Sequence, residues 1–181
     1  MDFELVKSFL EKSSSGVSSE DIDSMPFRFF EPMIMSGLKV DLIERGRVLC
    51  SMKVPPRLLT PFSCFVFSEI EDSVTNFLFR NHGLKNVGNS LHGGATAALV
   101  DVVGSSVIMT MDSVTTTGVS VEINVSYLDA AFVGDEIEIE AKALRVGKAV
   151  AVVSVEFRKK KTGKIIAQGR HTKYLAVSSK L

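Results

Sequence analysis

The sequence is poor in the residues that mark disulfide-bonded, metal-binding or nucleic-acid-binding proteins. Its 181 residues include two cysteines, three histidines and no tryptophan, and 21 basic residues balance 21 acidic ones. Two cysteines argue against a disulfide scaffold and favour a reducing compartment. The histidines have no neighbouring cysteine, so we expect no metal site. The balanced charge provides no field that would attract nucleic acid.

A long apolar run that could cross a membrane is also missing. The longest run, from Ala95 to Met111, is interrupted by Asp101 and is too short to span a bilayer comfortably. The residues from Met1 to Glu4 are acidic and no apolar stretch follows them, so we expect no secretory signal.

The last three residues carry a targeting signal. Ser179, Lys180 and Leu181 match the tripeptide that directs proteins to peroxisomes from a free C-terminus. We therefore expect a peroxisomal protein whose tail binds the import receptor. The alternative is a chance match in a protein of the cytosol or another organelle.

Alternating apolar and polar residues predict six β-strands. Two form a hairpin that turns at Glu44–Gly46 and ends at Pro55. Four follow the long apolar run, and turns with Gly147 and Gly163 favour an antiparallel meander. The expected strands cover residues 38–43, 47–54, 118–127, 136–141, 149–157 and 164–175.

The apolar run from Ala95 to Met111 predicts the one long helix. It is too long for a single strand, and its alanine and leucine content favours a helix. Because the run is apolar on every side, we expect the helix to be buried. One helix wrapped by an antiparallel sheet belongs to the α+β class.

The residues at the start of this helix are candidates for a role in catalysis. His92, Gly93 and Gly94 precede the apolar run, and the first N–H groups of a helix lack intrahelical partners. These groups and the positive helix end can stabilise an oxyanion. A plain helix cap with a close-packed glycine pair is the equally open alternative.

Asp101 is a carboxylate in the middle of the apolar helix. A buried acid is costly unless it is paired, so Asp101 is a candidate general base or nucleophile, or else a structural acid. It follows Gly93 by eight residues, which corresponds to about 12 Å along a helix. One carbonyl cannot touch both residues. They have unrelated roles, or two subunits of an obligate homodimer share the site.

Four ordered blocks resemble the hotdog-fold acyl-coenzyme A thioesterases, and among them the thioesterase superfamily member 2 branch. The resemblance implies a helix wrapped in a sheet, dimers that pair sheet edges, a homotetramer built from two dimers, and thioester hydrolysis with coenzyme A as part of the substrate and no other cofactor. The blocks are Leu91–Gly94 with Asp101, Gly118–Asn124, Arg145 with Gly147–Lys148, and Thr162–Lys173.

The resemblance also implies a role for each site residue. Asp101 activates water or attacks the thioester carbonyl. The Gly93 N–H forms the oxyanion hole with His92 beside it. Asn86 positions water or the thioester, and Ser120 positions water from the subunit opposite the oxyanion hole.

Coenzyme A is expected against two stretches and one tyrosine. Arg145 and Lys148 are candidate phosphate contacts, although a solvated turn explains them equally well. His171 is interpreted as a satisfied residue of the sheet. The expected contacts are Tyr127, Leu128, Asp129, Ala130, Ala131, Phe132, Arg145, Val146, Gly147, Lys148, Ala149, Val150 and Tyr174.

The chain departs from the family pattern at an aromatic-rich insert of about residues 60–85. The insert directly precedes Asn86, so Asn89 is a second candidate for that role. We expect an N-terminal helix and linker over 1–35, with the helix at Phe3–Lys12, a hotdog domain over 36–176 and a tail over 177–181.

Two other functions remain open at this stage. One is a hotdog acyl-CoA hydratase or dehydratase, which would use a histidine and a carboxylate as acid and base. The other is a non-catalytic acyl-CoA binding protein.

Overall fold

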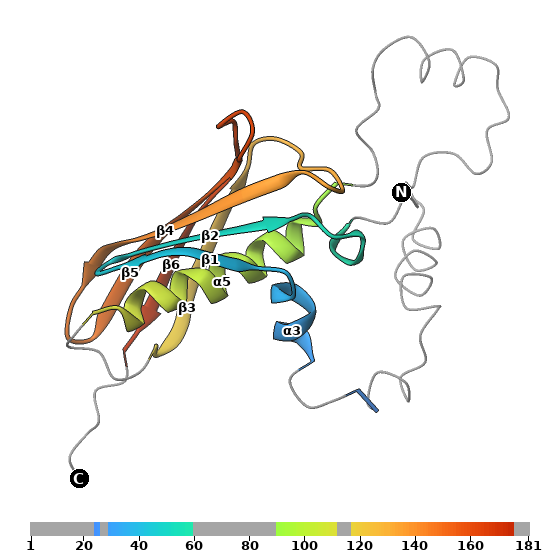
Figure 1. The fold of residues 1–181 in the computed structure, drawn as a ribbon. Coiled ribbons are helices and arrows are strands. Elements are labelled where there is room, and N and C mark those ends of the chain that lie inside the picture. The colour runs from blue at the N-terminus through green and yellow to red at the C-terminus, as the bar shows by residue number, and fades with distance from the viewer. Residues whose placement is uncertain (1–23, 26–28, 60–89, 112–116, 176–181) are drawn as a thin grey trace, which may run out of the picture. The chain divides into compact units, whose positions relative to one another are not determined.

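The computed structural model describes residues 24–25, 29–59, 90–111 and 117–175 (Figure 1). The chain divides into two compact units, Met1–Met33 and Ile34–Leu181. A short helix, α3, covers Phe30–Met35, and all the strands belong to the second unit. Several predictions fall outside the described residues: the helix at 3–12, the insert at 60–85, Asn86, Asn89 and the C-terminal tripeptide.

Six strands form one antiparallel sheet in the order β1-β2-β4-β5-β6-β3. The predicted strands are confirmed, with β4 longer than expected because it continues past a bulge between Ala143 and Arg145. The bounds are β1 Lys39–Glu44, β2 Arg47–Lys53, β3 Val119–Tyr127, β4 Glu136–Val146, β5 Val150–Lys159 and β6 Ile165–Tyr174. A 3-10 turn, η1, follows β2 at Pro56–Leu58.

The predicted four-stranded meander is wrong, because β3 pairs with β6 at the sheet edge and β2 pairs with β4. The connection after β3 explains this order. Its residues Leu128 and Asp129 donate backbone N–H groups to the carbonyl of Ile166 in β6. Gly134 then donates to the Val54 carbonyl just after β2. The connection therefore crosses the end of the sheet and brings β4 next to β2.

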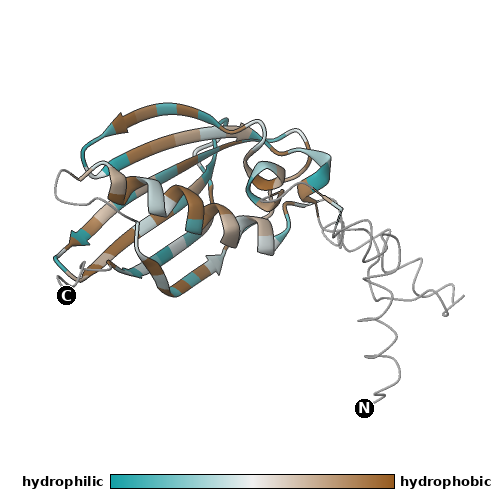
Figure 2. Cartoon of the chain, turned by 90° about the horizontal axis from the view of Figure 1, so that it is seen from below, coloured by the Kyte–Doolittle hydropathy of each residue, from teal (hydrophilic) through white to brown (hydrophobic). Residues whose placement is uncertain are grey.

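The long helix α5 covers Gly93–Met109 and lies across one face of the sheet (Figure 1). Leu99, Val100, Val103 and Val107 are buried and belong to the hydrophobic core with side chains of β2, β4 and β5. The expectation of burial on every side is wrong for the single chain, because one sheet covers only one side of a helix. The outer side carries both apolar and hydrophilic residues (Figure 2), and Met109 is exposed.

Two glycines let the helix approach the sheet closely. A Cβ at Gly104 would lie 3.1 Å from Val153 Cγ2, and one at Gly169 would lie 2.7 Å from Val100 Cγ2. The first contact is tight, and the second is so short that Val100 or the backbone would have to shift. The positions of the helix and of its side chains over β6 therefore depend on the absence of a Cβ at Gly169.

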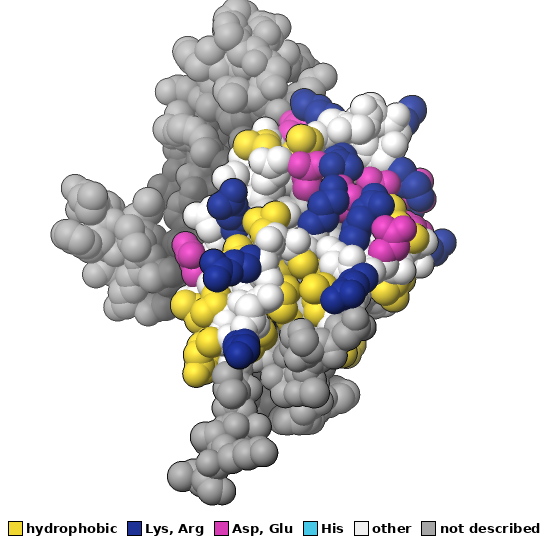
Figure 3. Space-filling view, turned by 90° about the vertical axis from the view of Figure 1, so that its left-hand side faces the viewer, with side chains coloured by type: hydrophobic (Ala, Val, Ile, Leu, Met, Phe, Trp, Pro, Cys, Tyr) yellow, Lys and Arg dark blue, Asp and Glu magenta, His cyan; other side chains and the backbone are white. Residues whose placement is uncertain are grey.

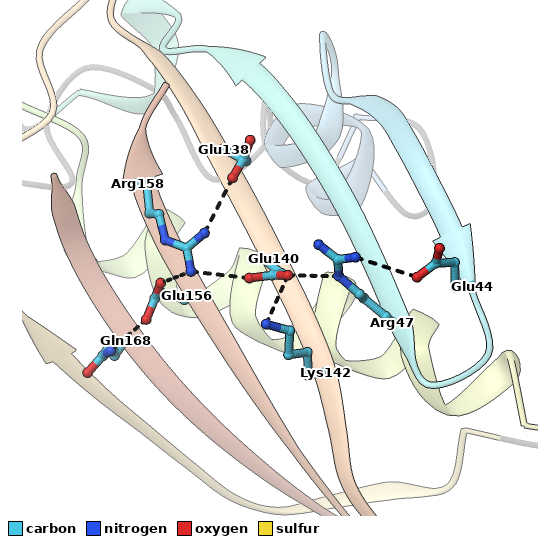
Figure 4. A network of polar contacts seen from close by, with 8 residues as sticks. All are labelled: Glu44, Arg47, Glu138, Glu140, Lys142, Glu156, Arg158 and Gln168. Carbon is cyan, nitrogen blue, oxygen red and sulfur yellow. Dashed lines mark hydrogen bonds and ion pairs between the residues drawn. The ribbon is translucent and has the colours of Figure 1, made fainter. Parts of the chain in front are cut away.

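The opposite face of the sheet carries a network of charges around Glu140, whose side chain is 6% exposed (Figure 4). Oε1 of Glu140 lies 2.8 Å from Arg47 Nε and 3.0 Å from Lys142 Nζ, and Oε2 accepts from Arg158 at 3.2 Å. Figure 3 shows basic and acidic side chains interspersed in one region of the face that it presents. Burial alone would raise the pKa of Glu140, but the hydrogen bonds from Lys142 and Arg47 outweigh it and lower that pKa.

Candidate active site

Asp101 lies on α5 with its side chain 44% exposed, so the expectation of a buried acid is wrong. The carboxylate sits beside the β3 edge, where the sheet ends and does not cover it. Its Oδ1 atom is surrounded by polar groups, whereas no described residue donates a hydrogen bond to Oδ2. The Oδ1 partners are Ser105 Oγ at 3.3 Å, Ser120 Oγ at 3.5 Å, His171 Nε2 at 3.6 Å and Lys173 Nζ at 3.7 Å.

These five residues, which we call the Asp101 cluster, come from three elements. Asp101 and Ser105 are four residues apart on α5 and therefore share one side of the helix. His171 and Lys173 alternate along β6 and both point toward α5. Ser120 of β3 stands opposite Lys173 in the strand register, next to a bulge between Ser120 and Glu122. The cluster thus depends on the β3–β6 pairing that the meander prediction missed.

His171 is fully buried, and its Nε2 atom lies 2.9 Å from Ser120 Oγ. Among the described residues its buried Nδ1 atom has no hydrogen-bond partner. Burial lowers the pKa of His171, the negative charge of Asp101 opposes this, and the positive charge of Lys173 lowers the pKa further. A neutral His171 with its proton on Nε2 donates to Ser120, which can then donate its own proton to Asp101.

The structure therefore adds three residues to the predicted site. His171 had been interpreted as a satisfied sheet residue, and Lys173 and Ser105 had not been singled out. A weak signal for them existed: Ser105 follows Asp101 by one helical turn, and His171 and Lys173 share one face of a predicted strand.

The start of α5 has a side-chain cap and also a backbone N–H group without an intrahelical acceptor. His92 is the N-cap, and its Nδ1 atom accepts a hydrogen bond from the Gly94 N–H at 2.9 Å. The N–H of Gly93, the first helical residue, has no intrahelical acceptor. Tyr127 donates from its hydroxyl to the Gly93 carbonyl at 3.0 Å. Both interpretations of this segment therefore apply. The His92 side chain caps the helix at the Gly94 N–H, and the Gly93 N–H remains suited to bind an oxyanion.

Gly93 and Asp101 belong to the same continuous helix, so they lie about 12 Å apart along its axis. A single thioester carbonyl cannot contact both in one chain. Of the two alternatives left open by the sequence, a site shared between subunits is the one that lets both residues act on one carbonyl.

The expected coenzyme A contacts lie at two ends of the sheet in one chain. Tyr127 and the stretch after it adjoin the start of α5, where Leu91 N–H donates to the Ala131 carbonyl. The stretch Arg145–Val150 forms the β4–β5 turn, and Tyr174 pairs with Val150 beside it. Asp129 is ion-paired with Lys164 at 2.8 Å, which lowers the pKa of Asp129. Asn86, the remaining predicted site residue, lies outside the described residues.

Within the described ranges, no group of three His, Cys, Asp or Glu residues could hold a metal ion. None of the helices described is both long and apolar enough for a membrane span.

Comparisons with known proteins place the chain in a family. The family model of the thioesterase superfamily matches residues 88–166. Acyl-coenzyme A thioesterase 13 from Homo sapiens is 37% identical over 139 residues, 76% of this chain and 80% of that protein. The Mus musculus protein of the same name is 48% identical over 86 residues, 48% of this chain and 61% of that protein, so this match spans less than two thirds of the mouse relative.

A solved structure supports the same assignment. Zebrafish thioesterase superfamily member 2 superposes with a TM-score of 0.62 and 32% sequence identity, over 85% of this chain and 89% of that chain. The likeness confirms the predicted hotdog fold, in which the sheet packs around one long helix. The shared sequence and the shared architecture lead to one conclusion: the chain belongs to the thioesterase superfamily.

Proposed function

We propose that the protein hydrolyses acyl-coenzyme A thioesters to a free acid and coenzyme A. The relatives named acyl-coenzyme A thioesterase support this substrate class. The observation that carries the proposal is the Asp101 carboxylate, which accepts hydrogen bonds at Oδ1 while Oδ2 is left without a described hydrogen-bond donor. A carboxylate held in this way can bind a water molecule and accept its proton.

The residues can perform the reaction in two steps. Oδ2 of Asp101 accepts a proton from water as the water oxygen bonds to the thioester carbonyl carbon. The Gly93 N–H of the opposite subunit stabilises the resulting oxyanion, aided by the positive helix end. The oxyanion then re-forms the carbonyl, the carbon–sulfur bond breaks, and the proton on Asp101 passes to the leaving thiolate. Asn86 would position the thioester or the water.

The reaction requires two copies of the chain, since Gly93 and Asp101 of one helix cannot reach one carbonyl. The surface that suits such a dimer is the β3 edge strand, where Val119, Val121 and Ile123 are exposed. Antiparallel pairing of two β3 edges would bury these side chains and satisfy backbone groups at the edge. We propose this homodimer as the functional unit and a homotetramer built from two dimers as the larger assembly.

Release of free thiol from a panel of aliphatic and aromatic acyl-CoA esters tests the proposed function. We expect the wild type to release thiol and Asp101→Asn to be severely impaired. A hydratase would change the absorbance of an enoyl-CoA without releasing thiol, and a binding protein would do neither. Equal thiol release by both proteins would remove Asp101 from the mechanism.

We also propose a peroxisomal location, supported by the tripeptide Ser179–Leu181 at the end of the sequence. A fluorescent protein fused to the N-terminus should enter peroxisomes. The same fusion with two residues appended after Leu181 should stay outside, because the receptor reads a free terminus. Identical distribution of the two fusions would contradict the proposal.

A further inference from the structure

Lys173 is a charged side chain in an unusual position. Its side chain is only 6% exposed, although lysine is almost never fully buried without a partner. Its Nζ atom donates to Ser105 Oγ at 2.8 Å and lies 3.7 Å from Asp101 Oδ1. The ammonium group therefore lies on the sheet side of Asp101, away from the exposed side of the carboxylate.

The donor and the acceptor in the Lys173–Ser105 hydrogen bond can be identified from their chemistry. An ammonium group can donate but cannot accept, so Ser105 Oγ must be the acceptor. The Ser105 hydroxyl proton is then available for Asp101 Oδ1, 3.3 Å away. Lys173 thus orients the Ser105 hydroxyl toward the carboxylate, as His171 orients that of Ser120.

Among the described residues, the charged groups that contact Asp101 come from β6. That strand contributes Lys173 and the titratable His171. The neighbouring elements contribute only hydroxyl groups, Ser105 from α5 and Ser120 from β3. On β5, the residues opposite Lys173 and His171 are Ala151 and Val153, which are apolar. Lys173 is therefore the one permanent positive charge close to Asp101 among the described residues.

We propose that Lys173 is a positioning residue of the thioesterase: through Ser105 it fixes Oδ1 of Asp101, so that Oδ2 faces the attacking water. The inference rests on the proposed function, in which Asp101 activates water. Lys173 itself lies beneath the carboxylate and is not required to contact the substrate. Its loss should disturb the chemical step and leave substrate binding nearly unchanged.

Steady-state kinetics of Lys173→Met provide the first test, since methionine keeps the length of the side chain but removes its charge and donors. We expect kcat to fall about 10- to 100-fold, the range seen when a reacting group is slightly misplaced, with KM within about 2-fold. Lys142→Met is the matched control, because Lys142 also pairs with a carboxylate, Glu140, but on the opposite face of the sheet. It should keep kcat within about 2-fold.

A double-mutant cycle with Ser105→Ala separates positioning from a general structural role. If Lys173 acts through Ser105, adding Lys173→Met to Ser105→Ala should lower kcat far less than it does in the wild type. Independent, multiplicative losses would contradict the inference. Should Lys173→Met fail to fold, Lys173→Gln, which keeps an N–H donor but no charge, replaces it in the same cycle.

NMR titration of His171 supplies a readout that needs no activity. Because the charge of Lys173 lowers the pKa of His171, that pKa should rise in Lys173→Met and stay low in the Lys142→Met control. An unchanged His171 titration would show that Lys173 does not lie in the Asp101 cluster.

The outcomes distinguish the two proposals. Absence of thiol release by the wild type would refute the proposed function and the inference that rests on it. An active wild type, an inactive Asp101→Asn and an unaffected Lys173→Met would leave the function standing and overturn the role of Lys173.

Discussion

Two carboxylates on opposite faces of the sheet have contrasting surroundings. Glu140 is nearly buried, and cationic groups bind both of its oxygens. Asp101 is close to half exposed, and the described hydrogen bonds to its side chain both go to Oδ1. Both oxygens of Glu140 are thus occupied by interactions within the fold, whereas Asp101 keeps one oxygen available for a ligand. We therefore propose a structural role for Glu140 and a chemical role for Asp101.

The largest expected effect comes from Asp101→Asn. The amide has nearly the same shape but cannot accept the proton of water, so kcat should fall about 1,000-fold, within the usual contribution of a general base. The melting temperature should change little, because the side chain is substantially exposed. Thiol release and thermal unfolding measure the two quantities. Glu140→Gln is the matched control, and the contrast fails if it loses activity to a similar extent while folded.

Glu140→Gln should instead lower stability, by about 2 kcal/mol, since it leaves Arg47, Lys142 and Arg158 without their shared carboxylate. The contribution of Glu140 to folding stability should also depend on pH, and it should be larger at neutral than at acidic pH. Because the folded state lowers the pKa of Glu140, the ionised group stabilises the protein above the unfolded pKa, about 4.3. This contribution disappears as the pH falls through the folded pKa. Denaturant unfolding between about pH 3 and 7 should show a smaller wild-type–variant difference at the acidic end.

Gly169→Ala should disturb the packing of α5 on the sheet and leave the Glu140 network on the opposite face of the sheet intact. The added methyl group would overlap Val100 of α5, and such overpacking typically costs about 1–3 kcal/mol. If α5 shifts in response, kcat should fall too, since Asp101 follows Val100. Gly163→Ala is the comparison, because nothing lies within 4 Å of its added methyl group and only its positive φ of 70° is strained. Equal stability losses would argue against close helix packing at Gly169.

The smallest effect is expected for Tyr127→Phe, which removes the hydrogen bond to the Gly93 carbonyl but keeps the ring. A less rigid oxyanion hole should lower kcat about 5- to 10-fold. Tyr174→Phe is the comparison, because Tyr174 is also an expected coenzyme A contact but its hydroxyl forms no described hydrogen bond; this variant should change KM and leave kcat unchanged. A result in which only KM changes would indicate that Tyr127 contacts coenzyme A and does not hold the helix start.

The periodicity of the sequence predicts the strands and the long helix, because alternation and apolar content reflect local exposure. It does not predict strand partners: the alternation of residues 118–127 is the same whether the strand pairs with β4 or with β6. The connection from Leu128 to Gly134 leads the chain from β3 to β4, and its contacts with β6 and with Val54 after β2 are backbone hydrogen bonds, which leave no side-chain pattern.

The site could be predicted only in part for the same reason. Asp101 and Gly93 stand in a recognisable segment, and their separation follows from helix geometry alone. Lys173 and His171 reach Asp101 through the packing of α5 on β6, and Ser120 reaches it through the pairing of β3 with β6. The expectation that Asp101 is buried failed because an apolar sequence does not reveal how much of a helix one sheet covers.

The central claim is that Asp101 of one protomer and the Gly93 N–H of its partner act on the same thioester. Mixed oligomers of two inactive variants test it most directly. Asp101→Asn removes the base, and Gly93→Pro removes the amide proton at a helix position that tolerates proline. After the variants are unfolded and refolded together in equal amounts, half of the dimers should contain one of each. Each mixed dimer would have one intact site, which restores about a quarter of wild-type thiol release. If each chain supplied both groups to its own site, the mixture would be as inactive as the separate variants.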